Sequence, residues 1–97
     1  MKPERHEKGW GYELWIVNNN LYCGKILHFN KGKKCSWHFH KIKQETFYLQ
    51  KGKLKVWFGH DNDIKKAKEI IVEPGQSFEV PIGLRHQILG LEDSDMF

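Results

Sequence analysis

Apolar and polar residues alternate along most of the chain, in short runs that end at glycine, proline or Asp/Asn turns. In one such run Leu54, Val56 and Phe58 share one parity, and lysines and a tryptophan occupy the positions between them. A period of two is typical of a strand that buries one face. The same criterion predicts further strands over residues 12–17, 21–29, 36–40, 45–50, 69–72, 77–80 and 86–91.

Short strands at this regular spacing predict an all-β domain, built as a small barrel or sandwich. Residues 64–71 have some helical character, but the segment is too short and too near a turn to form a regular helix. A length of 97 residues corresponds to one domain, which we place over residues 1–97. Residues 1–8 are rich in charge, and we expect them to form a flexible N-terminal segment.

Composition narrows the classes of function. Hydrophobic residues make up 39% of the chain and aromatic residues 13%, which excludes wholesale disorder. The net charge of +4 is spread along the sequence, so nucleic-acid binding is not expected. Lys51, Lys53 and Lys55 alternate with core positions and precede Trp57, and we interpret them as a solvated strand face, not a base-stacking strip.

The N-terminus, the apolar runs and the cysteines bear on localisation. Residues 1–8 lack the apolar core of a signal peptide, and no apolar run has the length of a membrane span. Cys23 and Cys35 have no CxxC spacing, so they indicate neither a disulfide framework nor a zinc ribbon. We therefore expect a cytoplasmic protein with reduced thiols. Cys35 has the parity opposite to that of His38 and is expected to face away from it.

Three histidines and one acid form the candidate site. His38 and His40 lie two residues apart on a predicted strand, so they share a face. Glu45 has the parity of the inward Phe47, and a carboxylate in an apolar interior is costly unless a cation balances it. His86 begins the last predicted strand, after a Pro-Gly turn. The alternative is that these histidines are isolated surface residues, but four residues that converge on one point disfavour this interpretation.

Three imidazoles and one carboxylate suit a divalent transition metal, which would be Mn, Fe, Ni, Zn or Cu. Four protein ligands leave two octahedral positions open for substrate or water. The sequence therefore predicts one such metal on His38, His40, Glu45 and His86.

The spacing of these residues resembles the two cupin motifs. The first motif is reproduced by Gly32, His38, His40, Glu45 and Gly52, which are separated by five, one, four and six residues. The second is reproduced by Gly75, Pro81, Gly83 and His86, which are separated by five, one and two residues. The resemblance implies a small cupin β-barrel, a double-stranded β-helix or jelly roll, with a metal in its interior. Gly90 stands where cupins often have Asn.

The Trp10-Gly11-Tyr12 segment also resembles the cupin domain of type II mannose-6-phosphate isomerases. It implies aldose–ketose isomerisation of a sugar or sugar phosphate. The alternative is that Trp10 and Tyr12 only pack against the barrel and have no role in catalysis. A metal-dependent cupin dioxygenase and a non-enzymatic cupin that binds a small ligand also remain open, so the sequence does not decide whether the protein is an enzyme.

Several residues are candidates for catalysis or substrate binding. His28, with apparent inward parity, is a candidate base, and a core histidine bonded to a carbonyl is the alternative. Arg85 beside His86 and Lys43 beside Glu45 are candidate clamps for a phosphate. Phe47, Phe58 and Phe78 are predicted on the inner wall, which suits an apolar ligand better than a bare sugar.

Cupins usually carry a closing strand after the second motif, whereas this chain ends at Phe97. We therefore expect one open barrel edge and a homodimer that covers it.

Overall fold

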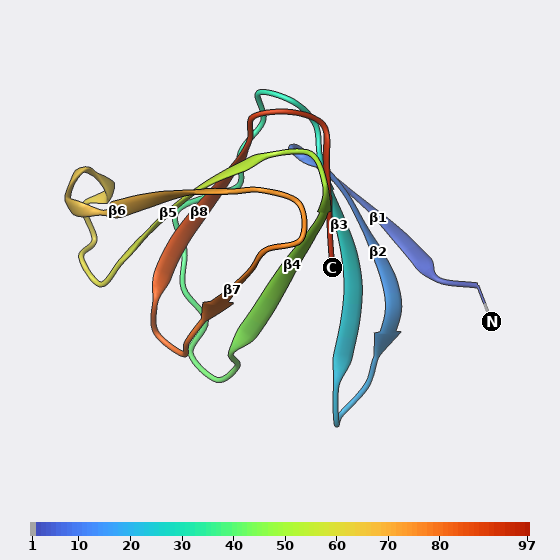
Figure 1. Ribbon diagram of the computed structural model, residues 1–97. Helices are drawn as coiled ribbons and strands as arrows, with labels where there is room; N and C mark the ends of the chain where they lie inside the picture. The colour runs from blue at the N-terminus through green and yellow to red at the C-terminus, as the bar shows by residue number, and fades with distance from the viewer. Residues whose placement is uncertain (1) are drawn as a thin grey trace.

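The computed structural model describes residues 2–97, which form nine strands and one short 3₁₀ helix (Figure 1). The elements are β1 (Glu4–Lys8), β2 (Gly11–Asn18), β3 (Cys23–Phe29), β4 (Glu45–Lys51), β5 (Leu54–Gly59), η1 (Ile64–Lys66), β6 (Lys68–Val72), β7 (Ser77–Val80), β8 (Arg85–Gly90) and β9 (Ser94–Met96). The predicted all-β class is confirmed, and the segment with helical character yields a single 3₁₀ turn followed by β6. No helix in the described part of the chain is long and apolar enough to cross a membrane.

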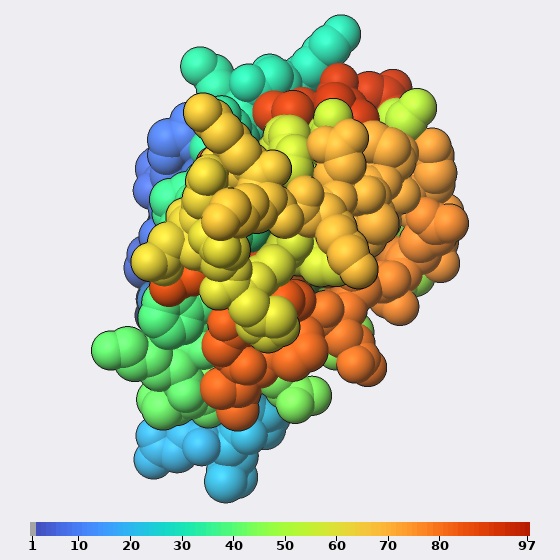
Figure 2. All heavy atoms as spheres, turned by 90° about the vertical axis from the view of Figure 1, so that its left-hand side faces the viewer, coloured from blue at the N-terminus to red at the C-terminus, as the bar shows by residue number. Residues whose placement is uncertain are grey.

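The strands form two sheets in which every pairing is antiparallel. One sheet has the order β1-β2-β3-β9-β4-β7 and the other the order β6-β5-β8. Figure 1 shows β5 and β8 on one side of the molecule and β2, β3 and β4 on the other. The outer surface of the β6-β5-β8 side is seen in Figure 2, where the tip of the β2–β3 hairpin projects at the lower end.

The core lies between the two sheets and comes from alternate strand positions. Leu54 and Val56 of β5 and Phe47 and Leu49 of β4 are all buried, as their parity predicts. The other buried apolar residues are Phe29, Val72, Val80, Ile88 and Met96. The interior is thus a jelly-roll core, filled from both faces.

Two strands appear where the sequence predicted none. The flexible segment expected over residues 1–8 is corrected for residues 4–8, because β1 pairs with β2 from Glu4 to Lys8; residue 1 lies outside the described residues. The open edge expected near the end of the chain is corrected by β9, which lies between β3 and β4. The side chain of Met96 is fully buried, and the Ser94 hydroxyl donates to the Glu92 carbonyl at 2.8 Å. The homodimer stays a prediction.

The strand predicted over residues 36–40 is also corrected. This segment makes only an isolated antiparallel bridge, between His38 and His86. The His38 amide donates to the His86 carbonyl at 3.2 Å, and the His86 amide donates to the His38 carbonyl at 2.9 Å. These two bonds fix the loop against β8 without a regular strand.

The two glycines of the first motif differ in what surrounds them, which gives a test of the fold. Both have positive φ, +100° at Gly52 and +80° at Gly32. A Cβ at Gly52 would collide with Ser94 and the Asp93 carbonyl, whereas one at Gly32 would meet nothing within 4 Å.

We expect Gly52→Ala to lower the free energy of unfolding by about 2–4 kcal/mol, because backbone and Cβ strain add. Gly32→Ala, the matched control, should cost about 1 kcal/mol from its φ alone. Urea unfolding measures both. Equal losses in the two variants would show that the β9 contact does not constrain Gly52.

Candidate metal centre

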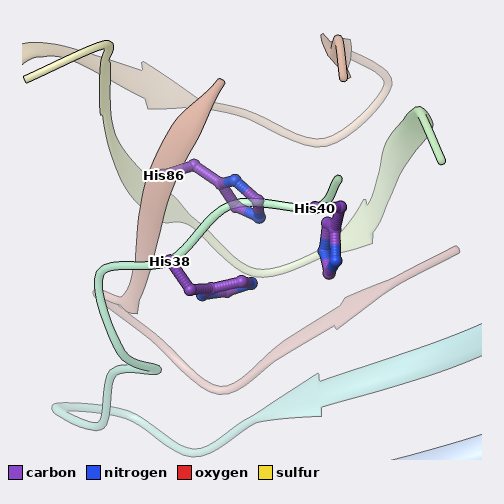
Figure 3. A group of neighbouring side chains, drawn as sticks. All are labelled: His38, His40 and His86. Carbon is purple, nitrogen blue, oxygen red and sulfur yellow. The ribbon is translucent and has the colours of Figure 1, made fainter. Parts of the chain in front are cut away.

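Three histidine rings converge at one place between the sheets (Figure 3). His86 comes from β8, and His38 and His40 come from the loop that precedes β4. One ring nitrogen of each histidine lies within 4.8 Å of those of the other two. The ring centroids are 4.3 Å apart for His38 and His86, and 5.1 Å apart for His38 and His40. The sequence prediction that these three imidazoles meet is therefore confirmed in the geometry.

Backbone carbonyls orient two of the rings. The Nδ1 atom of His38 lies 2.8 Å from the Ser36 carbonyl oxygen, and that of His86 lies 3.2 Å from the Leu84 carbonyl oxygen. A carbonyl only accepts, so each Nδ1 carries the proton and each Nε2 keeps its lone pair. Hydrogen bonds of this kind orient metal-binding histidines in proteins.

Glu45 stands next to the cluster at the first position of β4. Its Oε1 atom is 2.9 Å from His40 Nε2 and 3.5 Å from Lys43 Nζ. The carboxylate of this partly buried residue therefore has the Lys43 ammonium on one side and an imidazole nitrogen within hydrogen-bond distance on the other. His40 Nε2 and Glu45 Oε1, which face each other here, are also the atoms that would face a shared cation.

Burial keeps the histidines in the form that binds metal. It lowers the pKa of His86, which is 2% exposed, below the usual 6.5, and the Leu84 carbonyl opposes this effect. Burial also lowers the pKa of His40; Glu45 opposes this change, and the positive charges of Lys43 and Lys25 reinforce it. Both imidazoles are thus neutral at pH 7.

The donor set fits a metal ion chemically. Nitrogens bound to one ion at about 2.1 Å are at most about 4.2 Å apart, so small ring rotations bring the three imidazoles onto one centre. Neutral imidazoles with one carboxylate suit a divalent transition metal. The group of His38, His40 and His86 can therefore hold an ion.

A cavity of about 890 Å³ opens onto this cluster. All three histidines and Glu45 line it, together with Lys43 and Phe47 from the predicted site. Its outer part lies between the β2–β3 hairpin and the loop before β4, where the apolar side chains of Leu21 and Ile42 line it together with polar ones. The polar residues of this part include Asn18, Asn19, Asn20, Lys25 and Gln44.

A second, smaller cavity of about 370 Å³ contains two other predicted residues, Phe58 and Phe78. Its lining is mainly apolar, and His86 contributes to it as well as to the larger cavity. The predicted aromatic inner wall is thus divided. Phe47 faces the larger cavity, while Phe58 and Phe78 line a separate one.

Two predicted site residues lie elsewhere. Arg85 does not line either cavity, and its guanidinium carbon lies 4.4 Å from the centre of the Phe39 ring. His28 is on the opposite face of β3 from the cavity-lining Leu27 and Phe29, where its Nδ1 lies 2.6 Å from Asp95 Oδ1. The sequence explains both positions: Arg85 alternates with the inward His86, and His28 alternates with the buried Phe29.

Sequence reasoning missed most residues of the larger cavity, among them Lys25, Glu13 and Cys35. Lys25 has the parity of Leu27 and Phe29, so the alternation along β3 contained the signal. Cys35 was expected to face away from the metal site, but it packs against the core, and its Sγ accepts from the Ile88 amide at 3.3 Å. The irregular backbone between Cys35 and His38 explains this error, because strand parity does not hold there.

The Trp10-Gly11-Tyr12 segment has a packing role. Trp10 stacks on the buried Phe29 with centroids 4.2 Å apart, and Tyr12 stacks on His28 at 5.0 Å. A Cβ at Gly11 would collide with the His28 carbonyl, so glycine allows β2 to approach β3. Trp10 also lines the larger cavity, whereas Tyr12 does not.

The sequence model of the cupin domain matches residues 25–96. The chain belongs to the cupin family. In sequence, no curated protein matches this cupin.

Solved structures share its fold. KdgF from Halomonas sp. has a TM-score of 0.81 at 17% identity, with 96% of this cupin and 80% of that chain covered. CENP-C of Drosophila melanogaster, bound to CAL1, has a TM-score of 0.81 at 14% identity, with 97% and 76% covered. The capsular polysaccharide assembling protein CapF from Staphylococcus aureus has a TM-score of 0.80 at 24% identity; the match covers 97% of this cupin and 28% of CapF.

The two cysteines of this cupin provide a test of the cavity wall. Burial raises the pKa of the Cys35 thiol above its usual 9.0, whereas Cys23 is exposed. A raised pKa leaves less thiolate, so at about pH 8 iodoacetamide should alkylate Cys35 at least about tenfold more slowly than Cys23. Peptide mass spectrometry over time measures both rates. Similar rates in the folded protein would contradict the buried position of Cys35, and urea should equalise them.

Proposed function

We propose that this protein is a metal-binding cupin in which His38, His40, His86 and Glu45 hold one divalent transition metal. The observation that carries the proposal is the convergence of three imidazoles, with ring nitrogens within 4.8 Å of one another, at the wall of an open cavity. Glu45 adds an oxygen ligand 2.9 Å from His40 Nε2. When bound, the metal would polarise an oxygen of a molecule in the cavity.

The protein holds its ligands in place before a metal arrives. The backbone bonds between His38 and His86 fix the separation of the His38 loop from β8, and the carbonyls of Ser36 and Leu84 fix the ring orientations. Glu45 is held by its position at the start of β4. A preorganised site loses little conformational freedom on binding, which favours tight association.

We propose a small polar molecule, such as a sugar, as the ligand of the cavity. The amides of Asn18, Asn19 and Gln44 at the outer part of the cavity can bond hydroxyl groups, while Phe29 and Phe47 line its inner part. A polar rim over an apolar wall suits the two faces of a sugar ring. CapF, a capsular polysaccharide assembling protein, shares this fold, which is consistent with the proposal.

Aldose–ketose isomerisation stays a prediction. The position of His28 outside the cavity removes its candidate base. Of the residues that suggested the reaction, Tyr12 stacks on His28 outside the cavity, while Trp10 both stacks on Phe29 and lines the cavity. A cavity with amide and lysine side chains in its lining, beside a candidate metal centre, is what still supports it.

The metal site predicts that His40→Ala loses its ion. Elemental analysis of protein purified without an affinity tag should give about one transition metal per chain for the wild type and far less for His40→Ala, because one of few ligands is lost. Calorimetry on reconstituted protein should show affinity reduced at least about 100-fold.

His60→Ala is the control, since His60 is exposed and belongs to no cluster in residues 2–97. Full metal content in His40→Ala, or equal loss in His60→Ala, would overturn the assignment.

The isomerase prediction is tested on the metal-loaded protein with fructose 6-phosphate and mannose 6-phosphate. Interconversion that disappears in His40→Ala and survives in His60→Ala would support it. A metal-loaded protein that leaves both sugars unchanged would refute isomerisation, and the proposed metal-dependent binding would then account for the cavity.

A further inference from the structure

We propose that Lys25 makes the cavity selective for anionic ligands, so that a sugar phosphate or sugar acid binds in preference to the neutral sugar. The inference deepens the proposed function, on which it rests, by naming the charge of the ligand and the side chain that recognises it. Lys25 lies on β3, on the wall formed by the six-stranded sheet, whereas His86 comes from the other sheet. A ligand in the cavity would thus have the metal centre on one side and Lys25 on another.

The Lys25 side chain is held in place by two neighbours on β2. Its Nζ atom lies 4.3 Å from the centre of the Trp15 ring, opposite which Lys25 is paired in the sheet. The same Nζ atom is 3.8 Å from Glu13 Oε1, and that oxygen accepts a hydrogen bond from Trp15 Nε1 at 2.8 Å. A cation on an aromatic face is stabilised without using its hydrogen-bond donors.

The Lys25 ammonium therefore keeps donors for a ligand. Its 3.8 Å separation from Glu13 Oε1 is longer than the roughly 2.7–3.2 Å of a hydrogen bond, so the pair is loose. The side chain is 21% exposed, which places the charge in partly desolvated surroundings where an ionic contact is stronger than in water.

The charges around the cavity also favour an anion. Lys8, Lys25 and Lys43 line it against two acids, Glu13 and Glu45, so one positive charge remains. A divalent ion would add two more. A concave wall with excess positive charge concentrates anions, and a neutral sugar would leave that charge uncompensated.

The other basic side chains are less suited to this role. Lys43 is 55% exposed and lies 3.5 Å from the carboxylate of Glu45, at the metal centre itself. Arg85, the clamp expected from the sequence, stacks on Phe39 outside both cavities. Lys25 thus takes the role that the sequence analysis gave to Arg85.

The chain contains a matched control for this arrangement. Lys55 on β5 is 28% exposed, lies 3.3 Å from Glu69 Oε2 and is 5.3 Å from the Trp57 ring centre. The same three residue types thus meet at a place that lines neither cavity. Removing Lys55 changes the net charge as removing Lys25 does, but leaves the cavity unchanged.

The experiment is calorimetric titration of the protein, metal-loaded and metal-free, with glucose, glucose 6-phosphate and glucuronate. The wild type should bind at least one of the two anions about tenfold more tightly than glucose, and added salt should reduce the difference. Preference for glucose 6-phosphate would identify a phosphate ligand, and preference for glucuronate a carboxylate ligand.

Single-residue variants then show which side chain causes the preference for an anion over glucose. Lys25→Met should remove most of it, and Lys25→Gln gives a second, polar replacement should the first fail to fold. Glu13→Gln should act in the opposite direction, because it removes a competing carboxylate and so tightens anion binding. Lys55→Met should behave as the wild type.

The outcomes separate this inference from the metal proposal. A protein that takes up no metal refutes the metal site, while Lys25-dependent anion preference in the metal-free protein would still support this inference. Equal affinity for glucose and both anions, no measurable binding of any of the three, or a preference unchanged in both Lys25 variants would overturn it.

Discussion

The two backbone hydrogen bonds between His38 and His86 are the interaction on which the site depends. They lie within a longer irregular pairing, since the Cys35 amide donates to the Ile88 carbonyl and the Gly32 amide donates to the Gly90 carbonyl. The loop therefore follows β8 over several residues without forming a regular strand. This pairing fixes the distance between two imidazoles that are far apart in the sequence, and the turn after His40 then brings Glu45 to the same place.

The strand pattern could be predicted from the sequence wherever one face is buried. Leu54 and Val56, or Phe47 and Leu49, alternate with polar residues because the core accepts only one face of each strand. The three histidines could be predicted as a group because their spacing relative to the turns matches the two cupin motifs, even though the loop of His38 and His40 is not a strand.

Other features carried no such signal. β1 is held to β2 by backbone pairing and by contacts of His6 with the Trp15 ring and of Arg5 with the Tyr12 ring, and its five residues are all polar, so no apolar alternation marks it. β9 has only three residues, of which Met96 alone is apolar and buried. His28 lies between apolar residues on both sides, so its parity was ambiguous, and only pairing with the neighbouring strands decides it. Arg85 was assigned by proximity in sequence to His86, yet neighbours on a strand point to opposite faces.

The position of β9 has a consequence for how the protein folds. β3 and β4 do not pair with each other, and Ser94–Met96 pairs with both. Leu27 and Met96, which are register partners, are separated by most of the chain, so the six-stranded sheet closes through contacts of high sequence separation. Such contacts slow folding, because a large loop must be ordered before they form. During synthesis β3 and β4 would each present a free edge until β9 leaves the ribosome, and free edges promote association with other chains. The strand that completes the barrel therefore also ends the period in which the growing chain is most exposed to aggregation.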